Sequence, residues 1–287
     1  MTVATATYDP GMPEGDTIHR SAAVLRATLV GKQLKAFEAR RLIGPVPTIG
    51  ATIEGVEARG KHIEMAFDDG VILHTHMRMT GAWHVYREGE RWRKNPHAAR
   101  AVIDVAEWTA VCFSAPVVET FRVKDPRRHP GLGTIGPDLC RPDADLDDCV
   151  ERMARFVDHH QEIAEVLLDQ RVAAGVGNVY KSEVLWACEL DPFTPLGQVG
   201  VPLRRELIAT AARLLQANLE SPDRATVAAG GLAVYGRHLQ PCLRCGGCIE
   251  WRKHGTFARI TFWCPSCQKA PVIDLTRSRR SARSAAR

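Results

Sequence analysis

The sequence lacks the features of a membrane or exported protein. Its 287 residues contain no apolar run of about eighteen residues, the length needed to cross a bilayer. The N-terminus also lacks the basic, apolar and small-residue regions of a secretory signal. We therefore expect no membrane span and a cytoplasmic location.

Net charge is scarce outside the C-terminal end. The formal charge is +5, and residues 276–287 hold five arginines and no acid, which leaves the rest near neutral. Any nucleic-acid-binding face must therefore come from local clustering of charge. We expect the basic tail, residues 273–287, to be disordered.

Cysteine is too rare for a disulfide scaffold, with nine in the whole chain. Four are predicted to be buried core thiols: Cys112, Cys140, Cys149 and Cys188. The other five lie close together near the C-terminal end. Among them are two CxxC pairs separated by eighteen residues, namely Cys242, Cys245, Cys264 and Cys267. This spacing is typical of a zinc ribbon, in which four thiolates hold one structural Zn²⁺ around a β-hairpin.

Cys248 leaves one alternative for the metal ligands. Cys245 and Cys248 also form a CxxC pair, which could replace Cys242 and Cys245. We favour Cys242 and Cys245, because Gly246 then stands where a zinc knuckle turns sharply.

The periodicity of apolar residues predicts an α+β fold. A helix is expected to begin just after residues 12–15, and short β-rich stretches follow from Leu34 to about Thr120: 53–57, 62–67, 71–76 and 101–105. They indicate a β-sandwich with a flanking helix. Helical spacing returns in 150–156, 163–168, 179–186 and 203–219. We divide the chain into an extra segment 1–11, a sandwich 12–140, a helical domain 141–236 and a zinc ribbon 237–272 with its tail.

Two motifs could carry function. Residues 173–178 read Ala-Ala-Gly-Val-Gly-Asn, a turn that feeds a helix N-terminus and can bind a phosphate, although an ordinary helix connection is also compatible. The stretch from Met12 to Thr17 begins with an initiator-like methionine. Its removal would expose Pro13 as a secondary amine, which can attack a sugar C1′ and form an iminium ion. The adjacent Glu14 could supply a proton.

These motifs occur together with an Arg59-Gly-Lys-His62 turn and an Arg259-x-Thr-x-x-Cys-Pro finger. The combination resembles the formamidopyrimidine-DNA glycosylase and endonuclease VIII family from Met12 to Lys269. The opening Pro-Glu-Gly-Asp-Thr is most similar to the endonuclease VIII branch of actinobacteria. The resemblance implies a helical domain of helix-two-turn-helix type, with duplex DNA bound between the domains.

The resemblance also implies site residues. Pro13 would be the Schiff-base nucleophile, Glu14 the proton donor, Lys61 an acid that contacts phosphates, and Arg259 a finger residue that assists the second elimination. Without the family, Lys61 and Arg259 would be read as solvated surface charges.

Further residues are expected to contact the DNA. Asn178 matches the position that binds the phosphate beside the lesion. Arg78, Met79 and Thr80 match the loop that fills the space left by an extruded nucleotide, and Met79 is the best wedge, although a core methionine is the simple alternative.

The sequence departs from the family pattern at three places. Eleven residues precede Met12, and if they persist, Pro13 is an amide without the free valence that an iminium needs. We therefore predict that the functional chain starts at Met12. Thr17 replaces the family's second acid, with Asp16 beside it. The finger hairpin is about two residues longer than usual, near residues 251–257.

We therefore predict a monomeric DNA glycosylase and abasic-site lyase of base excision repair. Its substrate would be double-stranded DNA with oxidised bases, pyrimidines favoured, or abasic sites, cleaved by β,δ-elimination. One rival is a catalytically silent DNA or lesion binder with Pro13 blocked. The other is a zinc-ribbon nucleic-acid protein with an unrelated N-terminal domain.

Overall fold

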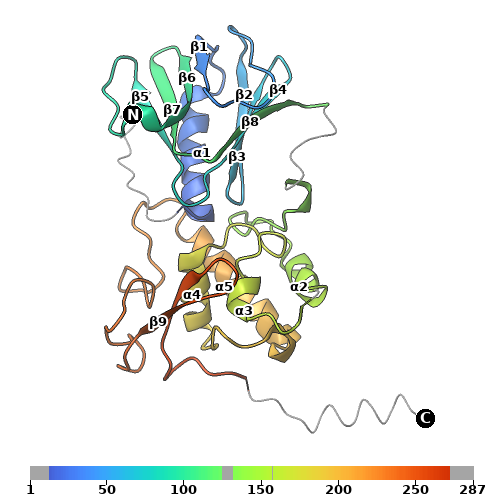
Figure 1. Cartoon of the computed structure of the whole chain (residues 1–287), viewed down its shortest axis with the longest axis vertical. Coiled ribbons are helices and arrows are strands. Elements are labelled where there is room, and N and C mark those ends of the chain that lie inside the picture. The colour runs from blue at the N-terminus through green and yellow to red at the C-terminus, as the bar shows by residue number, and fades with distance from the viewer. Residues whose placement is uncertain (1–12, 125–131, 157, 272–287) are drawn as a thin grey trace, which may run out of the picture.

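The computed structural model describes residues 13–124, 132–156 and 158–271. The predicted start at Met12, the extra segment 1–11 and the basic tail 273–287 lie outside the described residues. No helix in the described ranges is long and apolar enough to cross a membrane. Figure 1 shows two stacked bodies, with the strands of the N-terminal half above the helices of the C-terminal half.

The N-terminal half contains two four-stranded antiparallel sheets, with strand orders β1-β6-β7-β5 and β2-β3-β4-β8. Their bounds are β1 (Ala36–Glu38), β2 (Ile53–Arg59), β3 (His62–Phe67), β4 (Val71–His76), β5 (Ala82–Arg87), β6 (Ala99–Val105), β7 (Trp108–Phe113) and β8 (Val117–Arg122). Of the four stretches we expected, 62–67 and 71–76 have the predicted bounds. The predicted α+β fold with an N-terminal β-sandwich is confirmed.

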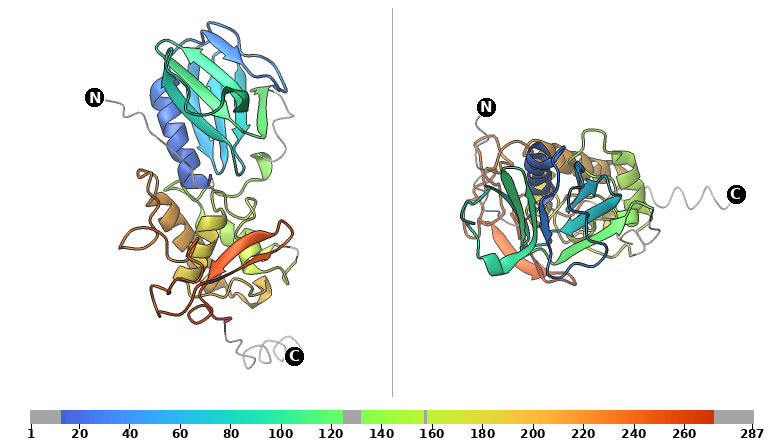
Figure 2. Two further views of the ribbon diagram at one scale, coloured as in Figure 1. Left: turned by 60° about the vertical axis from the view of Figure 1, so that its left-hand side comes forward. Right: turned by 90° about the horizontal axis from the view of Figure 1, so that it is seen from above.

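Helix α1 (Gly15–Leu29) lies along the sandwich (Figures 1 and 2). It contacts β2 and β5, which are edge strands of the two different sheets. Ile18, Ala22, Leu25 and Leu29 recur at helical spacing and are buried in one core with residues of both sheets. The helix therefore closes the open side of the sandwich, and its N-terminal end points toward the second body.

The C-terminal half begins as a helical domain with a separate core. Its helices are α2 (Leu146–Ala154), α3 (Ile163–Val166), α4 (Asn178–Ala187) and α5 (Val201–Gln216). The chain also forms three short 3-10 helices in the described residues. η1 (Pro96–Ala98) lies between β5 and β6 of the sandwich, η2 (Leu132–Thr134) precedes α2, and η3 (Leu196–Gln198) precedes α5. Helix α2 begins earlier than expected from 150–156, because Asp145 caps it by accepting the Asp148 N–H at 2.9 Å. Helix α3 is a single turn, shorter than 163–168.

The last element is an antiparallel hairpin of β9 (Glu250–His254) and β10 (Arg259–Trp263). The hairpin packs against α4, and Trp186 and Phe262 contact a small buried cluster that includes Cys242 and Cys264. In Figure 2 the hairpin crosses in front of the helices below the sandwich. It therefore belongs to the helical half, and its tip faces the junction of the two bodies.

The sandwich core offers a matched test of this packing. Ile53 on β2 is fully buried, whereas Ile49 in the preceding loop is 59% exposed. Ile53→Ala is expected to lower the free energy of unfolding by about 2 to 5 kcal/mol, because it leaves a cavity. Ile49→Ala should change it by less than about 0.5 kcal/mol. Denaturant titration of both variants measures the difference, and equal losses would contradict this core.

Candidate active site and metal centre

A cleft of about 880 Å³ lies where the two bodies and the hairpin meet. The sandwich half contributes residues such as Pro13, Lys61 and His76, and the helical half contributes Asn178. The hairpin adds His254, Thr256, Phe257 and Arg259. Six of the residues predicted from sequence line this one cleft: Pro13, Lys61, Arg78, Met79, Asn178 and Arg259.

The side chain of Glu14 is seated on the N-terminus of α4. Its carboxylate oxygens accept the backbone N–H groups of Gly177 at 3.0 Å, Val179 at 2.7 Å and Tyr180 at 3.2 Å. These amides have no partner within the helix, and the helix dipole favours an anion there. The glycine turn that we expected to bind a phosphate therefore binds the carboxylate of Glu14 across the domain junction.

Glycines make this close approach possible. A Cβ on Gly177 would stand 2.3 Å from Cδ of Glu14, and a Cβ on Gly15 would stand 2.7 Å from Cα of Gly175. Gly175 has φ of +104°, which side chains rarely adopt. The Gly15 N–H also donates to the Gly175 carbonyl at 2.9 Å. The Pro-Glu-Gly motif and the Gly-Val-Gly-Asn loop therefore bind each other directly.

Burial shifts the pKa values of the two groups beside Pro13 in opposite directions. Glu14 is completely buried, and desolvation raises its pKa, although Arg224, Lys61 and the Val179 N–H oppose the shift. Desolvation lowers the pKa of Lys61, opposed by Glu14 and supported by Arg259 and Arg224. The carboxyl is thereby favoured as an acid, and the amine loses its proton more easily than an exposed lysine.

Thr17, which we expected in place of a second acid, and the neighbouring Asp16 have separate structural roles. Thr17 caps α1: its hydroxyl donates to the Glu14 carbonyl at 2.8 Å and accepts the Glu14 N–H at 2.9 Å. Asp16 is fully buried and pairs with Arg224, whose Nε and Nη2 lie 2.9 and 2.7 Å from its oxygens. Neither residue lines the cleft.

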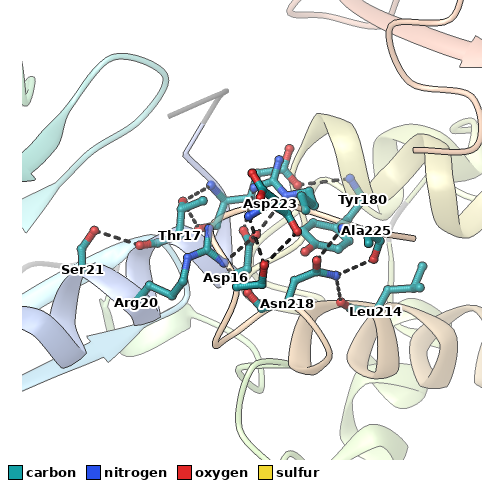
Figure 3. Close-up of polar contacts among 12 residues, drawn as sticks. Asp16, Thr17, Arg20, Ser21, Tyr180, Leu214, Asn218, Asp223 and Ala225 are labelled. Carbon is teal, nitrogen blue, oxygen red and sulfur yellow. Dashed lines mark hydrogen bonds and ion pairs between the residues drawn. The ribbon is translucent and has the colours of Figure 1, made fainter. Parts of the chain in front are cut away.

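The loop that follows α5, residues 218–225, binds the first turns of α1, as Figure 3 shows. The Asn218 side chain donates to the carbonyls of Leu214 and Ala225, at 2.8 and 2.9 Å, and accepts the Ala225 N–H at 2.7 Å. The backbone carbonyl of Asn218 accepts a hydrogen bond from Arg20 of α1. Together with Arg224, this loop holds the N-terminal end of α1 against the helical domain.

Asp138 connects three segments at the same junction. Its carboxylate lies 2.8 Å from Nε2 of His19 on α1 and accepts the Gly60 N–H at 2.7 Å and the Cys140 N–H at 3.0 Å. These contacts lower the pKa of Asp138 despite its burial. Since Gly60 immediately precedes Lys61, Asp138 fixes the turn that places Lys61 in the cleft. Sequence reasoning missed this residue, which has no motif around it.

Two predicted DNA contacts meet at the mouth of the cleft. Met79 is 51% exposed, so it is not a core methionine, and the neighbouring Arg78 has a positive φ of 46°. The Met79 Sδ accepts a contact from Nη1 of Arg259 at 2.9 Å. The tip of the sandwich loop and the hairpin therefore touch across the cleft.

Asn178 is engaged within the protein in this structure. Its amide donates to the Ile260 carbonyl at 2.7 Å, and its oxygen accepts from Nζ of Lys181 at 2.7 Å. Lys181 is fully buried and also donates to Oγ1 of Thr261 at 2.6 Å. Desolvation lowers the pKa of Lys181 to about 7. This lysine, which the sequence analysis did not select, joins the Asn178 turn to the strand that begins with Arg259.

The four ribbon cysteines come together at the base of the hairpin. The Sγ atoms of Cys242, Cys245, Cys264 and Cys267 lie within 4.8 Å of one another. Sulfurs ~2.3 Å from a tetrahedral zinc lie roughly 3.8 Å apart. The Cys242–Cys267 and Cys245–Cys264 sulfurs are 3.9 and 3.6 Å apart, so the group fits a metal of that kind. Cys248 is exposed and stands outside the group.

Two family models match most of the chain. The formamidopyrimidine-DNA glycosylase N-terminal domain matches residues 12–130, and the formamidopyrimidine-DNA glycosylase H2TH domain matches residues 135–228. The first match excludes a zinc-ribbon protein with an unrelated N-terminal domain.

Curated relatives agree with this assignment. The "Probable endonuclease 8 2" of Streptomyces coelicolor is 37% identical over 91% of this chain and 95% of its own. The "DNA-(apurinic or apyrimidinic site) lyase Nei2" of Mycolicibacterium smegmatis is 36% identical over 90% of this chain and 100% of its own.

Solved structures share the fold. The MutM (Fpg) protein of Thermus thermophilus is 28% identical, with a TM-score of 0.75 over 89% of this chain and 98% of that one. Lactococcus lactis Fpg in complex with abasic-site DNA has a TM-score of 0.75 at 23% identity, over 90% of this chain and 100% of that one. The chain belongs to the formamidopyrimidine-DNA glycosylase and endonuclease VIII family of DNA-repair glycosylases and lyases.

Proposed function

We propose that the protein is a bifunctional DNA glycosylase and abasic-site lyase of base excision repair. Its substrates would be duplex DNA with abasic sites or oxidised bases, with pyrimidines favoured. The observation that carries the proposal is the convergence of Pro13, Lys61 and Arg259 on one cleft beside the buried carboxyl of Glu14. The names of the two relatives, endonuclease 8 and abasic-site lyase, support it.

Pro13 is the proposed nucleophile. Its nitrogen attacks C1′ of the extruded nucleotide, the C1′–base bond breaks, and the departing base takes up the proton that the amine loses. A proton then passes to the sugar ring oxygen, the C1′–O4′ bond breaks, and the nitrogen lone pair forms the iminium. The iminium acidifies C2′–H, and loss of that proton expels the 3′ phosphate. A second elimination releases the 5′ phosphate. This sequence requires a free amine, and so a chain that begins at Pro13.

Glu14 and Lys61 supply the protons in this proposal. The raised pKa of Glu14 keeps a proton available for the ring oxygen above the pH at which an exposed glutamate ionises. The lowered pKa of Lys61 lets its amine donate and accept a proton near a leaving phosphate. Arg259, which lines the same cleft, would neutralise charge on the phosphate during the second elimination.

The DNA contacts follow from the same cleft. Met79, half exposed at its mouth, would fill the space of the extruded nucleotide, with Arg78 beside it on the backbone. Asn178 would bind a phosphate next to the lesion. Because its side chain now pairs with Ile260 and Lys181, phosphate binding would exchange at least one of those hydrogen bonds.

One structural Zn²⁺ would be held by Cys242, Cys245, Cys264 and Cys267. Four thiolates leave no open position for water, so the metal would stabilise the hairpin that carries Arg259.

A catalytically silent lesion binder is the second candidate. The sequence carries twelve residues ahead of Pro13. If they remain attached, the cleft can still bind DNA, but an amide nitrogen cannot form the iminium.

The state of the N-terminus is tested by reductive trapping. Protein that begins at Pro13, mixed with abasic-site DNA and borohydride, should form a covalent adduct because reduction fixes the iminium. The same protein that keeps residues 1–12, whose terminal amine lies twelve residues before Pro13, should bind this DNA but form no adduct. Denaturing electrophoresis measures the adduct, and efficient trapping by the extended form would refute the role of Pro13.

The Glu14 carboxyl is tested by substitution and pH. Glu14→Gln should lower kcat/KM for base excision by about 10²- to 10⁴-fold. It should still be trapped on a preformed abasic site, because an abasic sugar already equilibrates with its open-ring aldehyde and needs no proton from Glu14 to open. With the native residue, excision should decline as pH rises through a pKa above the ordinary value of about 4.3. A Gln variant with the native excision rate would exclude Glu14 as the acid.

The metal centre is tested with a matched pair of cysteine variants. Cys264→Ser should lose bound zinc and weaken strand cleavage, because the ribbon needs four thiolates to fold. Cys248→Ser should keep both. Atomic absorption on purified protein measures the zinc, and loss of the metal from Cys248→Ser instead would show that the ligand set is different.

A further inference from the structure

The tip of the β9–β10 hairpin carries an exposed aromatic ring. Phe257 is 80% exposed, the highest value among the exposed large apolar side chains of the described residues. It lines the cleft two residues before Arg259. Exposing an apolar ring of this size to water is unfavourable, and Phe257 belongs to none of the hydrophobic core clusters of the described residues. The Phe257 ring is therefore available to contact a ligand that enters the cleft.

The helical domain braces the backbone of the hairpin on both sides of its tip. His254 Nδ1 lies 2.7 Å from Oε2 of Glu162, and the Thr256 N–H donates to Oε1 of Glu165 at 3.0 Å. Arg252 stacks 3.3 Å from the centre of the Phe193 ring. Three contacts with the helical domain thus brace the strand and the tip. The backbone that carries Phe257 is thus held before a partner binds, which lowers the entropic cost of ordering the tip.

The backbone at the tip of the hairpin has two residues with a positive φ angle, Gly255 and Ala258. Gly255 has φ of +72°, and a Cβ there would stand 2.0 Å from Oε1 of Glu165. Ala258 has φ of +47°, which is unfavourable for a residue with a side chain. The turn spans residues 255–258 between the paired residues His254 and Arg259, and it places Phe257 at the tip.

The chemistry of the cleft identifies the partner. Its lining includes the cations Lys61, Arg78, Arg171 and Arg259, which suit a phosphate backbone. Phe257 can contribute only apolar and stacking contact, and the matching group in nucleic acid is the face of a base. Met79 touches Arg259, so the wedge that unstacks the DNA lies near the hairpin tip.

We propose that Phe257 stacks on an unstacked nucleobase that flanks the extruded nucleotide, and so forms a second DNA contact opposite Met79. The proposal rests on the proposed function, because it requires lesion DNA in this cleft. Intact duplex keeps its bases stacked and offers no free face, so Phe257 should favour damaged over undamaged DNA.

Affinity for a duplex with a tetrahydrofuran abasic analogue tests this contact. Phe257→Ala should weaken binding by about tenfold, or ~1.4 kcal/mol, since one aromatic face is lost. Phe257→Trp should restore the affinity to within about twofold of the native value, because its ring also stacks. On undamaged duplex the Ala variant should change the affinity by less than about twofold. Leu239→Ala, at a side chain 72% exposed outside the cleft lining, is the matched control and should change neither.

A direct readout comes from 5-iodouracil placed beside the tetrahydrofuran site. Irradiation should crosslink this base to the peptide that contains Phe257. If native protein is trapped on abasic DNA but Phe257→Ala binds it with unchanged affinity, the stacking contact alone is refuted. If native protein does not bind the abasic analogue, both the stacking and the proposed function are wrong. Tight binding without trapping, together with a weakened Ala variant, supports the stacking and refutes the enzymatic step.

Discussion

The arrangement of the protein depends on one buried carboxylate at the end of a helix. Glu14 is completely removed from water, and it is satisfied there because three backbone N–H groups at the start of α4 point at it. The contact joins residues more than 160 positions apart and fixes the junction of the two halves. It also fixes Pro13, the covalent neighbour of Glu14, at the wall of the cleft.

Further hydrogen bonds and ion pairs hold the residues around the buried Glu14 carboxyl. Asp16 and Arg224 form an ion pair beside Glu14, and Arg224 opposes the desolvation that raises the pKa of Glu14. Asp138 secures the turn before Lys61 from the linker between the halves. Lys181 secures the hairpin by donating to Asn178, Thr261 and the Ile260 carbonyl. The contacts of Asp138 and Lys181 thus support the cleft-lining residues Lys61 and Asn178, so the site depends on the junction as much as on its own residues.

The sequence was most informative where a local pattern determines structure. Helical spacing in α1 and the four paired cysteines needed no tertiary information, and the bounds of β3 and β4 follow from β-rich stretches between turns. The partner of the Gly-Val-Gly-Asn loop could not be predicted, because an anion at a helix N-terminus can come from a ligand or from a distant residue. Asp138, Lys181 and Glu162 carry no motif, and they gain their roles only when folding brings other segments against them.

Position and reactivity at Pro13 have different physical origins. The position follows from the seat of Glu14 on α4, from the close approach of Gly15 to Gly175 and from the cap formed by Thr17. None of these contacts uses the nitrogen of Pro13. The reactivity depends only on whether that nitrogen is an amine or an amide, since delocalisation into a carbonyl removes the lone pair. These contacts are therefore the same in both covalent states, whereas only the free amine has the lone pair that an iminium needs.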